Sequence, residues 1–223
     1  MIFTLTEPLK HMYPGACAGV LVLDDVSNPP QHAGLDERKQ ALQDELRAKF
    51  AGKDRAAVMA LDSMRAYAAY YKRFDKTYHV QLQLESIVYK GKSIPGVAAL
   101  VEAMFMAEVK NMLLTAGHDL DTLQPPVRMD AANGSERYTL LRGQEQTLKA
   151  GDMYIADELG VISSILYGPD QRSQINPGTR RALFTVYAPD GIGAAAVRQH
   201  LEDILTNVRI FAPQAKVEVL EVD

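Results

Sequence analysis

Apolar and polar residues in the first half of the chain follow a helical period. Four apolar side chains recur at helical spacing among charged ones: Leu35, Leu42, Leu46 and Phe50. This pattern predicts an amphipathic helix that Gly52 ends. A second helical stretch covers residues 55–74, where Tyr70 and Tyr71 indicate a core-facing stripe rather than a base-stacking surface. Residues 78–89 fit a strand by their alternation and a helix by their length, so both assignments stay open.

The most apolar segment of the chain lies at residues 97–114. Its strongly polar residues do not gather on one face, and they are Glu102, Glu108, Lys110 and Asn111. A helix that is apolar all round is mostly buried, so we predict a buried helix here. Any carboxylate on it that is buried needs a partner or a proton. The charged residues inside the segment argue against a membrane span.

Short strands dominate the second half. Apolar runs between Gly, Asn or Asp turns predict strands at residues 127–129, 137–141, 153–157, 161–167 and 182–187. A strand at 16–23 precedes the helices, and a helix at 194–207 and a strand at 216–222 close the chain. Helices first and strands later indicate an α+β fold rather than a wound βαβ sheet. The length suits a single domain over residues 1–223.

Composition narrows the classes of function. With 24 basic and 28 acidic residues the net charge is −4, so binding a polyanion would need a local cluster of cations. The single cysteine, Cys17, excludes an intramolecular disulfide and a cysteine-based zinc site, and its apolar surroundings are typical of a buried thiol. The N-terminal segment MIFTLTEPLK lacks the features of a signal peptide, so we expect a cytoplasmic protein without membrane contact.

Common cofactor and catalytic motifs are missing from the sequence. It contains no GxxxxGK[ST], no GxGxxG that opens a helix after a strand, no HExxH and no GxSxG. The five histidines lie too far apart for a local metal motif, so we expect neither a metal nor a cofactor. The GIGAA segment at residues 191–195 indicates a flexible entry to a helix rather than a phosphate loop.

Four segments in the middle of the chain are informative as an ordered series. They are VEAMFMAEVKNMLLTAGHDLDTL, VRMDAANGSERYTLLRGQEQTL, GDMYIADELGVISSILYG and NPGTRRALFTVYA. In this order they resemble the B3/B4 domain of the phenylalanyl-tRNA synthetase beta subunit. The family pattern has a buried helix with an acid, an Asp-Leu-Asp segment, a Val-Arg strand, a series of Gly turns and a Thr-led strand. The resemblance covers residues 71–189.

The resemblance implies an α+β, three-layer fold with a β-sandwich part and with helices largely from the first half. It also implies a domain that binds the tRNA acceptor end and hydrolyses wrongly attached tyrosine. A free-standing copy would recognise tRNA or aminoacyl-tRNA and would act in trans as a hydrolytic editor of misacylated tRNA, that is, an aminoacyl-tRNA deacylase.

The resemblance also places a set of residues at the ligand or tRNA pocket, without a catalytic role for any of them. They are Glu102, His118, Asp119, Arg128, Glu136, Tyr167, Gly168, Thr179 and Thr185. Glu102 stands at the helix acid, Arg128 on the Val-Arg strand and Thr179 at the head of the closing strand. Gly168 falls in the pocket loop.

Several pocket groups of the family are replaced in this chain. Met104 and Phe105 stand where the family has a Thr-Asn pair after the helix acid. Ala116 stands where a His precedes Asp119, and Thr185 stands where a Glu follows the Thr-led strand. A pocket can reject an amino acid that lacks a hydroxyl only if it hydrogen-bonds that hydroxyl. Met104 and Phe105 cannot do so, and this puts deacylation of tyrosyl-tRNA in doubt.

Arg128 and Glu136 have two interpretations. In the structural one they form a cross-strand ion pair beside a Gly turn, worth at most about 1 kcal/mol if exposed. In the functional one they support a pocket wall, with Gly168 and Thr179 as its floor.

Three functions therefore remain as hypotheses. The first is recognition of tRNA or aminoacyl-tRNA, which predicts a cluster of cations on the pocket side, drawn from Lys72, Arg73, Lys90, Lys92, Arg180 and Arg181. The second is binding of a small amino-acid-like ligand by a protein that no longer binds RNA. The third is an interaction module, which would need an exposed apolar patch.

Overall fold

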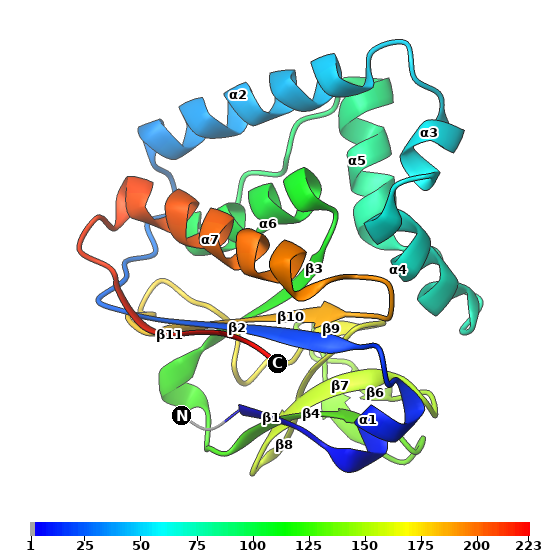
Figure 1. The fold of residues 1–223 in the computed structure, drawn as a ribbon. Coiled ribbons are helices and arrows are strands. Elements are labelled where there is room, and N and C mark those ends of the chain that lie inside the picture. Colours follow the sequence, from blue (N-terminus) through cyan, green and yellow to red (C-terminus); the bar gives the residue numbers. More distant parts are fainter. Residues whose placement is uncertain (1–2) are drawn as a thin grey trace.

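The chain folds into three layers, which Figure 1 shows one above the other. The structure, a computed structural model, describes residues 3–223. Helices form one layer, a four-stranded antiparallel sheet lies in the middle, and a five-stranded sheet lies below it. The two sheets pack on each other as a β-sandwich, so the architecture is α+β.

The middle sheet has the strand order β11–β2–β10–β3. Its strands are β2 (Cys17–Asp24), β3 (Leu114–Asp119), β10 (Ala182–Ala188) and β11 (Lys216–Val222). Every residue of β3 and β10 is buried, because helices cover one face of the sheet and the lower sheet covers the other. Strands covered on both faces are apolar along their whole length, which explains the unbroken apolar runs of β2 and β10.

The lower sheet has the strand order β1–β4–β7–β8–β9. Its strands are β1 (Phe3–Leu5), β4 (Val127–Ala131), β7 (Met153–Asp157), β8 (Gly160–Ser164) and β9 (Gly168–Pro169). A separate hairpin pairs β5 (Arg137–Thr139) with β6 (Glu145–Thr147). A bridge between Leu140 and Asp170 ties this hairpin to the segment after β9.

The helices follow the predictions in outline. They are α1 (Glu7–Met12), α2 (Ala33–Phe50), α3 (Arg55–Met59), α4 (Asp62–Lys72), α5 (His79–Lys90), α6 (Ala99–Asn111) and α7 (Ala194–Phe211), with a 3-10 turn at Leu120–Thr122. The stretch 55–74 is two helices rather than one. The buried helix is confirmed as α6, but the predicted end at 114 was wrong, because Met112 is left-handed (φ 59°) and β3 follows.

Tyrosines of α4 fasten the helical layer to both sheets. The hydroxyl of Tyr67 donates to the carbonyl of Tyr187 in β10, and the hydroxyl of Tyr71 donates to the carbonyl of Ile165 (2.5 Å), just after β8. Tyr70 and Tyr71 are 3% and 2% exposed. The prediction that this aromatic stripe packs in the core is therefore confirmed.

A continuous hydrophobic cluster passes through all three layers, from Leu9 to Ala215. A smaller cluster, which includes Tyr138 and Leu148, lies beneath the β5–β6 hairpin. Among residues 3–223, no helix is both long enough and apolar enough to cross a bilayer.

Candidate functional site

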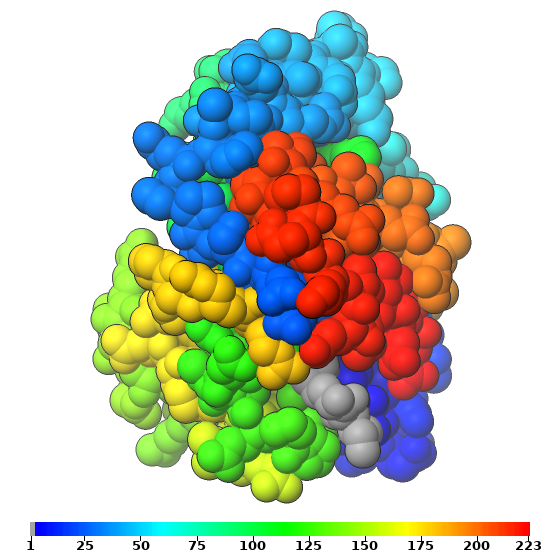
Figure 2. Space-filling view, turned by 90° about the vertical axis from the view of Figure 1, so that its left-hand side faces the viewer, coloured from blue at the N-terminus to red at the C-terminus, as the bar shows by residue number. Residues whose placement is uncertain are grey.

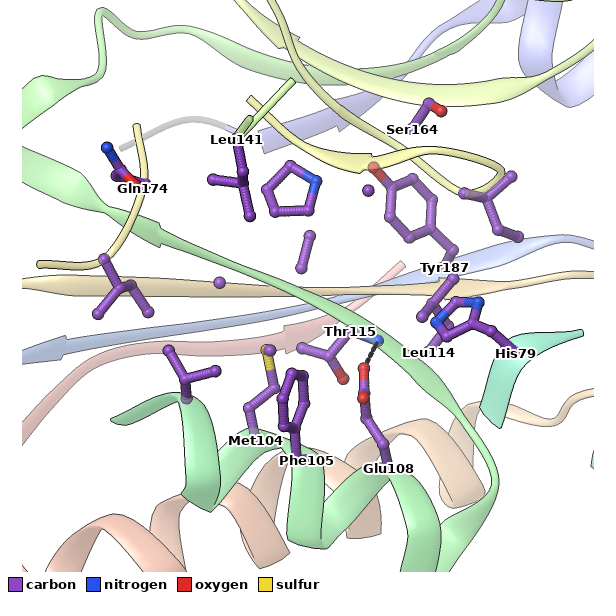
Figure 3. A pocket seen from close by; sticks show the side chains of 17 residues that line it. His79, Met104, Phe105, Glu108, Leu114, Thr115, Leu141, Ser164, Gln174 and Tyr187 are labelled. Carbon is purple, nitrogen blue, oxygen red and sulfur yellow. Dashed lines mark hydrogen bonds between the residues drawn. The ribbon is translucent and has the colours of Figure 1, made fainter. Parts of the chain in front are cut away.

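A cavity of about 230 Å³ lies between α6 and the facing ends of β3, β8 and β9. Figure 3 shows Met104, Phe105 and Glu108 rising into it from α6, with Leu141, Ser164 and Gln174 on the opposite side. The lining is mostly apolar and contains a few polar groups from different elements. This is the composition of a site for a small ligand with an apolar body and one or two polar ends.

Helical spacing explains the wall that α6 contributes. Val101, Met104, Phe105 and Glu108 stand at positions i, i+3, i+4 and i+7, so they share one face of the helix. Gly117 of β3 faces this wall. A Cβ at Gly117 would lie 2.9 Å from a methyl carbon of Ile175 and 3.3 Å from the sulfur of Met104, so the glycine allows these side chains to pack closely against β3.

Glu108 supplies the only carboxylate among the described residues that line the cavity. The residue is 2% exposed, and its Oε1 accepts the backbone N–H of Thr115 at 2.8 Å. Burial raises the pKa of Glu108 to about 8, against the smaller opposing effect of that hydrogen bond. The carboxyl is therefore mostly protonated at neutral pH, as expected for a buried acid without a cationic partner.

Glu102, the acid that the family resemblance selects, lies outside this cavity. Its Oε2 accepts Lys39 Nζ at 2.8 Å, and its Oε1 accepts the N–H of Val97 at 2.7 Å. A buried carboxyl group needs either a cationic partner or a proton. Glu102 has a partner, Lys39, and burial favours a proton on Glu108.

A buried polar chain stands behind Thr115. Its hydroxyl lies 2.6 Å from Nε2 of His200 in α7, and Asn111 Nδ2 lies 3.3 Å from Nδ1 of the same ring. Asn111 and Lys110 both donate to Asp203, at 2.8 and 2.7 Å. Burial lowers the pKa of His200 to about 4, so the ring is neutral. This chain anchors β3 against α7, and the anchored β3 presents the N–H of Thr115 to Glu108.

The opposite side of the cavity is built from β8, β9 and β10. Ser164 Oγ accepts the N–H of Tyr167 at 3.1 Å, and the hydroxyls of Ser163 and Tyr187 lie 2.5 Å apart. Gly168 has a φ of 84°, and its carbonyl accepts the hydroxyl of Tyr138 at 2.8 Å. Gly168 is the residue of the sequence-predicted set that lines the cavity.

Phe105 also borders a second cavity. The second cavity, of about 290 Å³, lies between α5 and α6 beside the segment 92–95, and its lining includes Ile87, Lys92 and Pro95. Phe105 lines both cavities. It stands at one of the positions where the family pattern has a polar residue.

Asp119, His118 and Thr179 come together at a different place, around the loop 170–180. Figure 2 shows this loop in gold beside the blue segment that follows β2. Asp119 Oδ2 accepts the hydroxyl of Thr179 at 2.7 Å and the side-chain amide of Asn176 at 3.0 Å. Nδ1 of His118 lies 2.7 Å from the hydroxyl of Ser173. These contacts fix the loop against β3 and β10, and none of these side chains lines the cavity.

The remaining predicted residues lie elsewhere. Arg128 approaches the carbonyl of Asp157 (3.4 Å), and Glu136 accepts the N–H groups of Asn133 and Gly134 (3.1 Å each). The hydroxyl of Thr185 points to the backbone of β3, where it donates to Ala116 (3.4 Å). Tyr167 lies beside the cavity, under Lys76. The cross-strand ion pair suggested for Arg128 and Glu136 is wrong, because each binds backbone groups instead.

Exposed cations stand next to the cavity rather than in it. Lys76 Nζ lies 4.6 Å above the ring of Tyr167, whose neighbour Gly168 lines the cavity. Arg142 is exposed at the tip of the β5–β6 hairpin and follows Leu141, which lines the cavity and is 45% exposed. The six cations predicted from the sequence are not among the lining residues. One of them, Arg181, binds Asp24, Asp121 and Glu218.

Within residues 3–223, no three His, Cys, Asp or Glu side chains gather closely enough to hold an ion.

The sequence was compared with models of known protein families. A sequence model of the B3/4 domain matches residues 62–206, more than half of the 223 residues. The chain belongs to the B3/4 domain family. This confirms the resemblance found in the ordered segments and extends it beyond residues 71–189. A comparison of this B3/4 protein with curated proteins finds no match.

A solved structure shares the fold of this B3/4 protein. It is an N-terminal fragment of the phenylalanyl-tRNA synthetase beta subunit from Pyrococcus horikoshii, with 12% sequence identity and a TM-score of 0.50. The alignment covers 97% of this chain and 50% of that chain, so the B3/4 protein spans about half the length of the fragment. At this identity the likeness concerns the fold, and it confirms the predicted three-layer α+β architecture.

Proposed function

We propose that this B3/4 protein recognises aminoacyl-tRNA and holds the amino acid in the cavity between α6 and β3. The observation that carries the proposal is an apolar cavity with convergent polar groups inside the family domain. The fold is shared with a fragment of a tRNA synthetase subunit, and this likeness is the reason for proposing tRNA as the carrier of the amino acid. Fold alone does not define function, so the ligand is argued from the cavity itself.

The size of the cavity supports an amino acid as the bound group. Pockets for drug-sized ligands measure roughly 300–1,000 Å³, whereas this cavity measures about 230 Å³. A nucleotide with its phosphates would not fit, and it would meet no Lys or Arg among the described lining residues. An apolar amino acid fits both the volume and the walls formed by Val101, Met104 and Phe105.

The exposed cations beside the cavity support a tRNA end as the carrier of that amino acid. Phosphate contacts from Lys and Arg supply most of the sequence-independent affinity for nucleic acids. Lys76 and Arg142 adjoin the cavity on different sides, from the loop before α5 and from the tip of the hairpin. A single-stranded acceptor end could pass between them while its amino acid enters the cavity.

Hydrolysis of the aminoacyl ester belongs to the proposal as its second step. Ser164 Oγ in the cavity lining accepts the N–H of Tyr167 and bonds to neither His79 nor Glu108. The hydroxyl of Thr115 does contact an imidazole, that of His200, but this ring lies behind β3 and outside the described lining. Ester cleavage would therefore use a bound water, with backbone N–H groups stabilising the oxyanion.

A deacylation assay with a panel of correctly and incorrectly charged tRNAs tests both steps, alongside a filter-binding assay with the same tRNAs at low salt. We expect binding of charged tRNA in preference to uncharged tRNA, and selective release of one amino acid. A bulky side chain in the cavity, Ala116→Phe, should abolish both, whereas Ala41→Phe on the exposed surface of α2 is the matched control. Equal binding of charged and uncharged tRNA would contradict the cavity assignment.

A second candidate function is binding of a free amino-acid-like metabolite. It is favoured by the absence of Lys and Arg among the described cavity-lining residues, because RNA recognition usually needs cations close to the site. A thermal-shift panel of amino acids and their amides separates the two functions. Stabilisation by a free amino acid, with no binding of charged tRNA at low salt, would favour the metabolite.

A further inference from the structure

We infer that Glu108 is the counter-ion for a primary ammonium group, so that the cavity selects ligands with a free α-amino group and rejects N-acylated ones. This inference rests on the proposed function and names the class of substrate: aminoacyl esters, as opposed to peptidyl or formylated ones. The family pattern does not select Glu108. The structure shows that Glu108 lies on the face of α6 that lines the cavity.

The geometry leaves one carboxyl oxygen of Glu108 free for a ligand. Oε1 accepts the N–H of Thr115 at 2.8 Å, and Oε2 makes no hydrogen bond to any residue in the described range. Figure 3 shows the carboxyl group at the cavity surface, with the dashed bond to Thr115 on one side. A charged ammonium donor is the strongest partner for such an oxygen in a low-dielectric site.

The protein supplies no cation of its own to Glu108. Lys110, the nearest cation in sequence on α6, donates to Asp203 on the α7 side. No Lys or Arg occurs in the described lining. A buried acid without a counter-ion is normally an unfavourable arrangement, and replacing it with an apolar residue would remove the cost. A carboxyl group in this position is therefore matched to a cation that arrives with the ligand.

The other titratable groups around Glu108 provide no second anion. Burial raises the pKa values of four phenols near it: Tyr67, Tyr71, Tyr78 and Tyr187. His79 from α5 lines the same cavity, and burial of its ring lowers its pKa. None of these groups is an anion at neutral pH, so an ammonium in the cavity would interact with Glu108 above all others.

Ligand binding would then move one proton. A ligand ammonium entering beside the protonated carboxyl of Glu108 favours the carboxylate, so the carboxyl proton leaves to solvent as the ion pair forms. The protonated free carboxyl resembles a glutamine amide in shape and charge. Glu108→Gln therefore keeps an acceptor for the N–H of Thr115, and we expect a folded variant that has lost the ability to ionise.

The experiment is titration calorimetry at about pH 6 with matched esters, repeated in buffers of different ionisation enthalpy to count protons. The probes are the methyl esters of L-phenylalanine, L-tyrosine, L-leucine and L-methionine. Each is compared with its N-acetyl form and with a desamino form, which is smaller and so separates loss of charge from steric exclusion. The proteins are the wild type, Glu108→Gln and the surface control Glu45→Gln on α2.

We expect free-amine esters to bind the wild type about tenfold or more tightly than their N-acetyl and desamino forms, in line with one charge-assisted contact. Their binding should release close to one proton. Glu108→Gln should lose the proton release and the preference, and Glu45→Gln should keep both. Equal binding of all three forms would overturn the inference and leave the proposed aminoacyl site standing. Binding of no ester at all would overturn both together.

Discussion

At the scale of the residue, two glutamates on the same helix differ in how their carboxyl groups are accommodated when buried. Glu102 and Glu108 stand on α6 and are both almost fully buried, yet only Glu102 has a cationic partner, Lys39. The environment of Glu108 is apolar except for one N–H, and burial raises its pKa to about 8. The two side chains are chemically identical, yet burial favours the protonated form of Glu108, whereas Glu102 forms an ion pair with Lys39.

The raised pKa of Glu108 predicts a pH dependence of stability. Its folded-state pKa lies above the ordinary value of about 4.3, so its contribution is fully present below that value and is lost as the pH rises through about 8. The glutamine in Glu108→Gln does not ionise, so the unfolding free energy of this variant does not fall with pH for this reason. Between pH 5 and 8.5 the unfolding free energy of the variant should gain about 2–4 kcal/mol relative to the wild type.

Urea denaturation of both proteins across this range is the measurement. Burial also raises the pKa of Asp152, to about 7, and this changes stability in the same direction in both proteins. The difference between variant and wild type therefore isolates Glu108. Parallel pH profiles would contradict the assignment of a raised pKa to this residue.

The sequence could place Glu108 on a buried helix but could not place it on the cavity face. A helix that is apolar all round has no polar side to fix its rotation, so Glu102 and Glu108 are equivalent in the pattern. The spacing of Val101, Met104, Phe105 and Glu108 selects one face only after the position of β3 is known. Family resemblance favoured Glu102, which the fold uses to bind Lys39.

At the scale of the element, periodicity predicted the long helices and the isolated strands. β7 and β11 have the predicted bounds, because turn residues flank both strands. The change from α6 to β3 was missed, since the apolar run continues and the chain turns at Met112 without a Gly or Pro. The break between α3 and α4 at Ala60 and Leu61 has no such signal either.

The contacts of α4 predict an uneven cost for removing tyrosine hydroxyls. The Tyr67 hydroxyl donates to the carbonyl of Tyr187 and accepts the N–H of Leu114 at 2.9 Å. Tyr67→Phe leaves both buried backbone groups unpaired, so we expect a loss of about 2–4 kcal/mol in unfolding free energy. Tyr89→Phe is the control, since its hydroxyl bonds to Asp54 from a side chain that is 41% exposed.

Urea unfolding compares the two variants directly. The control should lose less than about 1 kcal/mol, because water replaces the lost partner. Similar losses in both would mean that α4 is not held to β10 and β3 through Tyr67.

At the scale of the whole molecule, a net charge of −4 limits how the proposed tRNA ligand would be bound. The net negative charge repels a polyanion, and several cations are already paired, as Arg181 is with Asp24, Asp121 and Glu218. The cations that adjoin the cavity, Lys76 and Arg142, are therefore expected to supply a large share of the phosphate contacts. Affinity should be modest and confined to the acceptor end.

Salt dependence of tRNA binding tests this distribution of charge. Lys76→Ala and Arg142→Ala should each weaken binding to all tRNAs alike and reduce the slope of log K against log salt by about 0.7–1. Arg181→Ala should change neither quantity, because its charge is already balanced. Filter binding between low and moderate salt measures the slopes, and a dominant effect of Arg181→Ala would place the RNA away from the cavity, beside Asp121 and Glu218.

The shared wall formed by Phe105 has a consequence for how the ligand range of this fold can change. The side chain of Phe105 borders two cavities, of about 230 and 290 Å³. A smaller side chain at this position would add volume to both cavities at once. We therefore expect a single substitution at Phe105 to let the proposed amino-acid site admit longer side chains.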